Sequence, residues 1–114
     1  MILKVGEKVH IMIRRAFVGD LRRHFVGEIK EVAENAIRVK GYTFILDEAS
    51  GEYYRKPEVH TRIFSFLDGR TMISVIDPLT VIEKVAYRLS EENNLVATDG
   101  EHFQLDINEF GIRR

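Results

Sequence analysis

The chain has 114 residues, of which 45% are hydrophobic and 31% charged, and it carries a net charge of −1 and no cysteine. This length suits one domain with a single core, and the lack of cysteine excludes disulfides and thiolate metal sites. No apolar run approaches the roughly 20 residues that span a bilayer, and the first residues lack the pattern of a signal peptide, so we expect a cytoplasmic protein.

Charge is unevenly distributed along the chain. Residues 1–57 contain 11 Lys and Arg against 8 Asp and Glu, whereas residues 58–114 contain 6 against 10. The first half is therefore compatible with a basic face for a polyanion, although it is far less basic than domains whose charge alone identifies nucleic-acid binding. An ordinary solvated surface explains the same distribution.

The first predicted element is a strand at about 8–14, where Val9, Ile11 and Ile13 alternate with other residues. The stretch from Arg14 to Arg23 breaks this alternation and contains Gly19-Asp20, so it predicts a loop or wide hairpin.

Two further strands are predicted to form a long curved hairpin. The second strand resumes near His24, and Gly27 within it indicates a bend or a close backbone approach. Glu34-Asn35 predicts a tight turn, and a third strand follows over 37–46 with Gly41 as a second kink.

The middle of the chain predicts a polar connection and a second hairpin. Residues 47–60 are mostly polar and contain Gly and Pro, so we expect an exposed loop there. Residues 62–67 and 71–76 predict strands four and five, joined by the turn pair Asp68-Gly69.

After Pro78 the apolar spacing becomes helical, and Asp77 is a suitable cap, so the pattern predicts a helix at 78–92. A final strand over 81–87 is the competing interpretation. The remaining sequence predicts a small hairpin in which Asp99-Gly100 joins 95–98 to 102–107.

The spacing Gly27-x-Ile29-x-x-Val32, the pair Ile37-x-Val39 and the run Ile73-Ser74-Val75-Ile76-Asp77-Pro78 together resemble the Sm-like proteins, particularly the bacterial Hfq type, over about residues 8–78. The resemblance implies a strongly bent five-stranded sheet that closes into a small barrel, with subunits joined edge to edge into an RNA-binding ring. The expected fold is therefore mainly β: a small Sm-like or SH3-like barrel at 1–78, with a helix and hairpin at 79–114 packed on the same domain.

The chain departs from the family pattern at two functional positions. Ala33 stands where the family usually has an aspartate, and Asp68-Gly69-Arg70-Thr71 replaces the Tyr-Lys-His element of the Hfq type. Arg70 nevertheless keeps a cation in this turn.

One predicted nucleic-acid site is the basic loop that contains Arg14, Arg15, Phe17, Arg22 and Arg23. Its cations suit phosphates, and its aromatic ring suits stacking on a base. The alternative is a solvated loop whose arginines pair with neighbouring carboxylates such as Asp20 and Glu28.

The second predicted nucleic-acid site is the pair Asn35 and Arg70, because the resemblance implies that their turns meet at a ring pore. Asparagine can recognise a base edge, and arginine can hold a phosphate or a base. The alternative is that both residues serve backbone turns.

No catalytic or metal-binding pattern stands out. The four histidines lie in separate segments, and the carboxylates Asp47, Glu48 and Glu52 lie in a polar stretch that they keep soluble. We therefore expect no enzymatic activity, no metal and no cofactor.

The sequence thus predicts a non-catalytic RNA-binding protein that forms a homo-oligomeric ring through strand edges. One alternative is a β-barrel scaffold or adaptor that binds no nucleic acid. Another is a PilZ-like small-ligand sensor that uses paired arginines, although Asp47-Glu48-Ala49-Ser50-Gly51 departs from the usual spacing of that motif.

Overall fold

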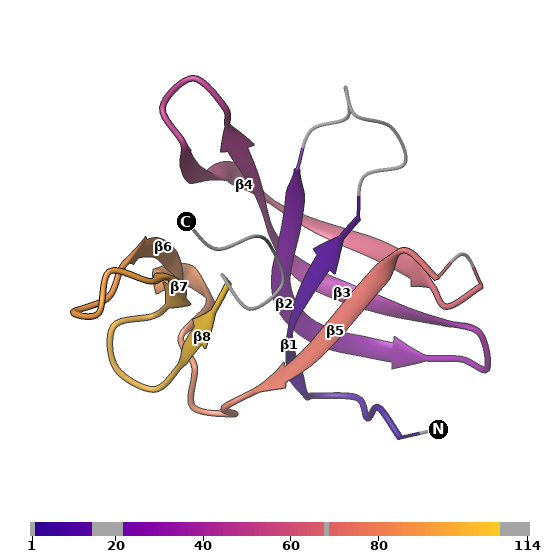
Figure 1. Ribbon diagram of the computed structural model, residues 1–114. Helices are drawn as coiled ribbons and strands as arrows, with labels where there is room; N and C mark the ends of the chain where they lie inside the picture. The colour runs from indigo at the N-terminus through magenta and orange to yellow at the C-terminus, as the bar shows by residue number, and fades with distance from the viewer. Residues whose placement is uncertain (1, 15–21, 68, 108–114) are drawn as a thin grey trace.

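The computed structural model describes residues 2–14, 22–67 and 69–107, and this part of the chain is mainly β (Figure 1). Five strands form one antiparallel sheet: β1 (Lys8–Ile13), β2 (Arg23–Val32), β3 (Ala36–Asp47), β4 (Glu52–Ser65) and β5 (Thr71–Ile76). A 3₁₀ turn, η1 (Ile82–Lys84), precedes a second sheet of β6 (Ala86–Leu89), β7 (Leu95–Thr98) and β8 (Gln104–Asp106).

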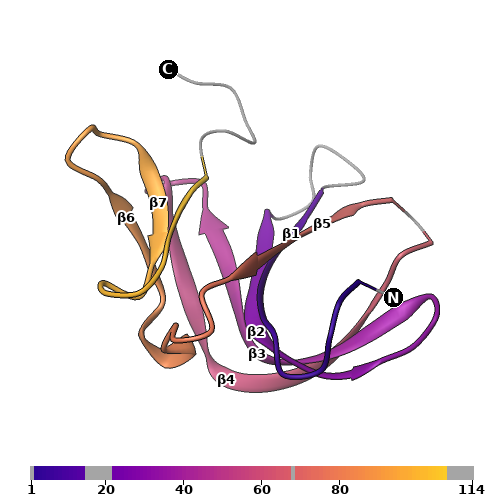
Figure 2. The same cartoon turned by 90° about the horizontal axis from the view of Figure 1, so that it is seen from below.

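The larger sheet is bent but open. Its strand order is β4-β3-β2-β1-β5, so β4 and β5 occupy opposite edges, and within the described residues they do not pair with each other. Figure 2 shows the sheet curling into a trough, with the smaller sheet on the outer side of the curve. The prediction of a closed barrel is therefore corrected to a bent open sheet.

Two glycines allow the close approach of β2 and β3 in the bend. Gly27 and Gly41 lie directly opposite each other in the ladder. A Cβ added at Gly27 would come within 3.0 Å of the Lys40 backbone, and one at Gly41 would do the same with the Val26 backbone. The two glycines that were predicted as kinks are thus ladder partners, at a point where β2 and β3 leave no room for a side chain.

The two faces of the bent sheet carry two hydrophobic cores. The inner face buries seven residues together: Val9, Ile11, Phe25, Ile29, Ile37, Val39 and Phe64. The outer face packs against the smaller sheet through Val26, Phe44, Ile76, Val85, Ala97, Phe103 and Ile107. Because neighbouring residues such as Phe25 and Val26 belong to different cores, the central strands are buried on both sides.

Strand β4 overturns the prediction of a long loop at 47–60. The connection is confined to residues 48–51, and β4 begins at Glu52. The ladder shifts register between Tyr42 and Phe44, where β3 advances two residues while β4 advances four, so Pro57 lies in an irregular stretch of an edge strand. A proline is tolerated there because its missing N–H removes no bond from a central ladder.

The predicted helix at 78–92 is wrong. Only η1 is helical there, and the chain continues as β6, so the competing prediction of a strand comes closer. Asp77 accepts a bond from the Leu79 backbone N–H, and Thr80 bonds back to the Asp77 carbonyl, which forms a tight turn in place of a helical one. The predicted hairpin after residue 94 is confirmed by the pairing of β7 with β8.

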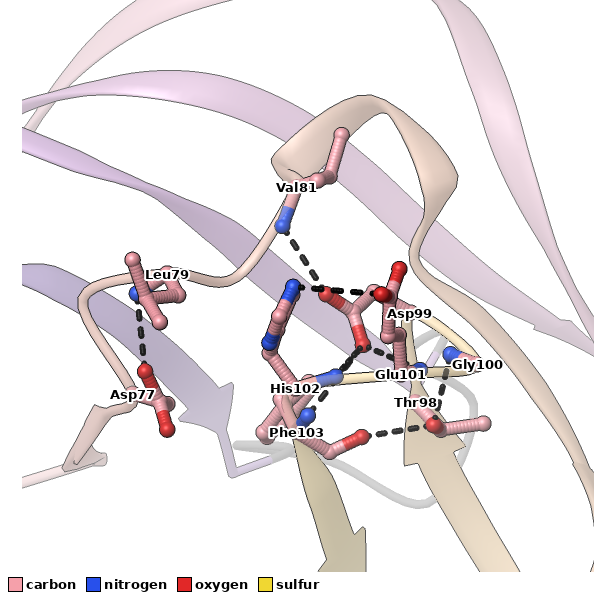
Figure 3. Close-up of polar contacts among 9 residues, drawn as sticks. All are labelled: Asp77, Leu79, Val81, Thr98, Asp99, Gly100, Glu101, His102 and Phe103. Carbon is pink, nitrogen blue, oxygen red and sulfur yellow. Dashed lines mark hydrogen bonds and ion pairs between the residues drawn. The ribbon is translucent and has the colours of Figure 1, made fainter.

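A buried carboxylate ties this connection to the smaller sheet (Figure 3). Asp99 Oδ1 accepts bonds from the backbone N–H groups of Glu101, His102 and Phe103, and Oδ2 accepts one from Val81. Burial favours the neutral acid, but these four donors outweigh it and lower the pKa of Asp99 to about 2. Asp99 therefore fixes the position of the second sheet relative to the 77–85 segment.

None of the helical segments among residues 2–14, 22–67 and 69–107 has the length and hydrophobicity that a transmembrane helix requires.

Candidate nucleic-acid interface

The structure gathers four arginines at one end of the larger sheet, which we call the arginine rim: Arg14, Arg22, Arg23 and Arg70. Ile13 pairs with Arg23 on β2 and with Thr71 on β5, so the ends of three strands meet there. The Arg14 backbone N–H donates to the Arg70 carbonyl over 2.8 Å. All four residues are exposed at this end of the sheet.

Carboxylates do not neutralise most of this rim. In the described part of the chain, the ion pairs are Lys30 with Glu28, Arg38 with Glu31 and His102 with Glu101. Glu28 thus pairs with a lysine, whereas the alternative interpretation paired it with the arginine loop. No described carboxylate lies within ion-pair distance of Arg14, Arg22 or Arg23. Arg14, Arg22 and Arg23 are therefore available to an external anion.

The structure regroups the two predicted nucleic-acid sites. Arg70, predicted to meet Asn35, has its backbone beside Arg14 in the rim. Asn35 is exposed in the β2–β3 turn, where its carbonyl accepts a bond from Phe66. Arg15 and Phe17 lie outside the described residues.

A buried cluster of two histidines and two tyrosines, which sequence reasoning did not find, lies on the outer face. His10 Nε2 and His24 Nδ1 contact the same Tyr87 hydroxyl at 2.8 and 2.5 Å. Tyr53 stacks on both His24 and Tyr87, with ring centroids 4.9 and 4.6 Å apart. The cluster joins β1, β2 and β4 of the larger sheet to β6 of the smaller one.

The cluster is held in its neutral form. Burial lowers the pKa of His10 to about 4, although a bond to its own backbone opposes the shift. Burial, with the charges of His10 and Arg22, lowers the pKa of His24 to about 3. Burial and Tyr53 raise the pKa of Tyr87 well above its usual value.

The hydrogen bonds of the Tyr87 hydroxyl indicate which atoms of the cluster donate and which accept. One hydroxyl between two neutral imidazoles donates to one ring nitrogen and accepts from the other. If the bond of His10 to its own backbone uses its Nδ1–H, then Tyr87 donates to His10 Nε2 and accepts from His24 Nδ1–H. In this arrangement the Tyr87 hydroxyl both donates and accepts, and it links the two sheets, so we call the cluster of His10, His24, Tyr53 and Tyr87 the latch.

The described residues contain no group of three or more His, Cys, Asp or Glu side chains placed to hold a metal ion. His60, predicted to stand apart from the other histidines, lies on β4.

Both edges of the larger sheet expose apolar side chains. On β4, Val59 is 48% exposed and Ile63 64%, and on β5, Met72 is 46% exposed and Val75 55%. An uncovered edge also presents backbone N–H and C=O groups that can pair with another strand. These edges are the second candidate interaction surface.

Searches for related proteins give no match to this chain among protein-family models, curated proteins or solved structures.

Proposed function

We propose that this chain is a cytoplasmic, non-catalytic RNA-binding protein of Sm-like type that assembles into a homo-oligomeric ring. The observation that carries the proposal is the arginine rim, where residues distant in sequence bring four exposed arginines to one end of the sheet. The sheet is bent, has a glycine on β2 where this strand closely approaches β3, and, among the described residues, has two edges without a partner strand. These features support the resemblance to the Sm-like proteins.

Guanidinium groups suit this role because they stay charged at all physiological pH values and bind phosphate oxygens in pairs. One rim offers only a few such groups, so a single subunit would bind weakly. A ring would repeat the rim around its axis, and the linked contacts would increase affinity through effective concentration.

The test is a titration of a fluorescein-labelled single-stranded RNA by anisotropy at 50 and 200 mM salt. On single strands each phosphate contact contributes about 0.7 to the salt slope, so the three arginines Arg14, Arg22 and Arg23 of one subunit predict binding at least about 20-fold weaker at the higher salt. Arg14→Ala with Arg23→Ala should reduce this slope to about a third. Arg38→Ala, which removes an arginine paired with Glu31 on another surface, is the control and should leave the slope unchanged.

No RNA binding at 50 mM salt would reject the proposal, as would equal effects of the rim and control variants.

A second candidate function is a scaffold that self-associates without nucleic acid, and the exposed edges of β4 and β5 favour it. Because the two edges differ, pairing β4 of one copy with β5 of the next is a head-to-tail contact that can close into a ring. Light scattering over a range of protein concentrations would measure this assembly. Ile63→Lys should shift the protein toward monomer, whereas Leu89→Lys, at an equally exposed position on the smaller sheet, should not.

A further inference from the structure

We infer that Tyr54, on the first part of β4, is a stacking platform for an unpaired nucleobase beside the arginine rim. This inference rests on the proposed RNA binding, and it adds a residue and a selectivity for single strands. The tyrosine was not among the predicted site residues, because its segment was expected to be a loop.

The ladder places Tyr54 in line with the rim. Arg23 on β2 pairs with Ile45 on β3, and Ile45 pairs with Tyr54 on β4. Side chains that lie directly opposite one another point to the same face of a sheet. Arg23 and Tyr54 therefore share the inner face, two strands or about 10 Å apart.

The tyrosine ring is free to contact a ligand. Tyr54 is 53% exposed, and it is the one aromatic side chain among the exposed large hydrophobic residues of the described chain. Its two neighbours, Tyr53 and Arg55, point to the outer face: Tyr53 stacks on the latch, and Arg55 lies over the Tyr42 ring and bonds to the Glu83 carbonyl. The outward contacts of Tyr53 and Arg55 thus hold the backbone on both sides of Tyr54, and the alternation of the strand leaves the Tyr54 ring on the inner face.

This arrangement matches how proteins hold single strands. A cation neutralises a phosphate while an exposed ring stacks on a base, and every base has a face that can stack. In a duplex the faces of the bases are already stacked on one another, so the ring has no partner there. Tyr54 should therefore strengthen binding to single-stranded RNA and not to a duplex of the same length.

The experiment measures binding of labelled single-stranded and duplex RNA to the full chain and to Tyr54 variants. Loss of one stacked base weakens binding by about 5- to 150-fold, so Tyr54→Ala and Tyr54→Leu should show this loss on the single strand with an unchanged salt slope. Tyr54→Phe should stay within about twofold of the original protein, because the ring remains. Leu89→Ala is the control for removing an exposed apolar side chain, and it should have no effect.

A fluorescence measurement tests the contact directly, because the chain has no tryptophan. The single tryptophan of Tyr54→Trp should be quenched by single-stranded RNA, whereas that of Leu89→Trp should not. Full affinity in Tyr54→Leu, or an unquenched Tyr54→Trp on a protein that binds RNA, would overturn the stacking role and leave the rim intact. If the unmodified protein binds no RNA at 50 mM salt, the proposed function itself fails.

Discussion

Mild acid should destabilise this protein because two buried histidines must stay neutral in the folded state. His10 and His24 have folded pKa values of about 4 and about 3, against 6.5 for an unperturbed histidine. Between these values the unfolded chain binds protons that the folded chain does not bind. The latch therefore contributes fully above pH 6.5, and its contribution is lost as the pH falls from 6.5 toward 4 and 3.

The size of the effect follows from the number of protons. Two such sites give a slope of up to about 2.7 kcal/mol per pH unit, which corresponds to a loss of about 4 kcal/mol in unfolding free energy between pH 7 and pH 5. This is a large part of the stability of a small domain, which is typically about 5–15 kcal/mol.

Urea unfolding followed by circular dichroism at pH 7, 6 and 5 measures this loss. His10→Gln with His24→Asn keeps a polar atom near each contacting nitrogen and removes the titration, so this double variant should lose much less stability over the same range. His60→Gln with His102→Gln is the control, and it should keep the steep dependence. A loss below about 1 kcal/mol in the unmodified protein would show that the two histidines are not held neutral by burial.

Three further substitutions test other parts of the structure by urea unfolding. Gly41→Ala should cost about 1–3 kcal/mol or more in unfolding free energy, because the new Cβ meets the β2 backbone. Gly51→Ala is the control: its Cβ meets no atom within 4 Å, so it should cost only about 1 kcal/mol for its positive φ. Equal losses in the two variants would contradict the close approach of β2 and β3 at Gly41. Asp99→Asn should cost about 2 kcal/mol in unfolding free energy at pH 7, and the difference from the original protein should fade as the pH falls from 3.8 through 2. An unchanged urea midpoint at pH 7 would show that the Asp99 carboxylate does not stabilise the fold. Thr43→Val should stabilise by about 1 kcal/mol, because the buried Thr43 hydroxyl has no hydrogen-bond partner in the described structure, and a loss of stability would reveal one.

The sequence predicted strands well where one face is regularly apolar and poorly where burial follows another pattern. The alternation of Val9, Ile11 and Ile13 located β1, because these residues point into the inner core. Strand β4 has little such alternation, since most of its side chains are exposed at an edge, and its polar composition resembled a loop. The helical spacing after Pro78 had a different origin: Ile82 and Val85 pack into the outer core from a 3₁₀ turn.

The candidate sites could be predicted only where their residues are close together in the sequence. A basic cluster was predictable because Arg14, Arg22 and Arg23 flank one short segment, but Arg70 joins them only through the pairing of β1 with β5. The latch was missed because His10 and Tyr87 are 77 residues apart and meet only after the smaller sheet has docked. The alternation that put Val9 and Ile11 on one face could have placed His10 on the opposite face. It could not have shown that His10 is buried there.

Docking of the smaller sheet links the latch to the proposed RNA surface, although the two lie on opposite faces. Tyr53 and Arg55 reach outward to the latch and to the Glu83 carbonyl, and this holds the end of β4 on which Tyr54 points inward. Without those outward contacts the first part of β4 would be held only by its ladder to β3, as an edge strand. The smaller sheet therefore helps to order the ring that we propose as a stacking platform, and an ordered ring loses less conformational entropy on binding than a mobile one.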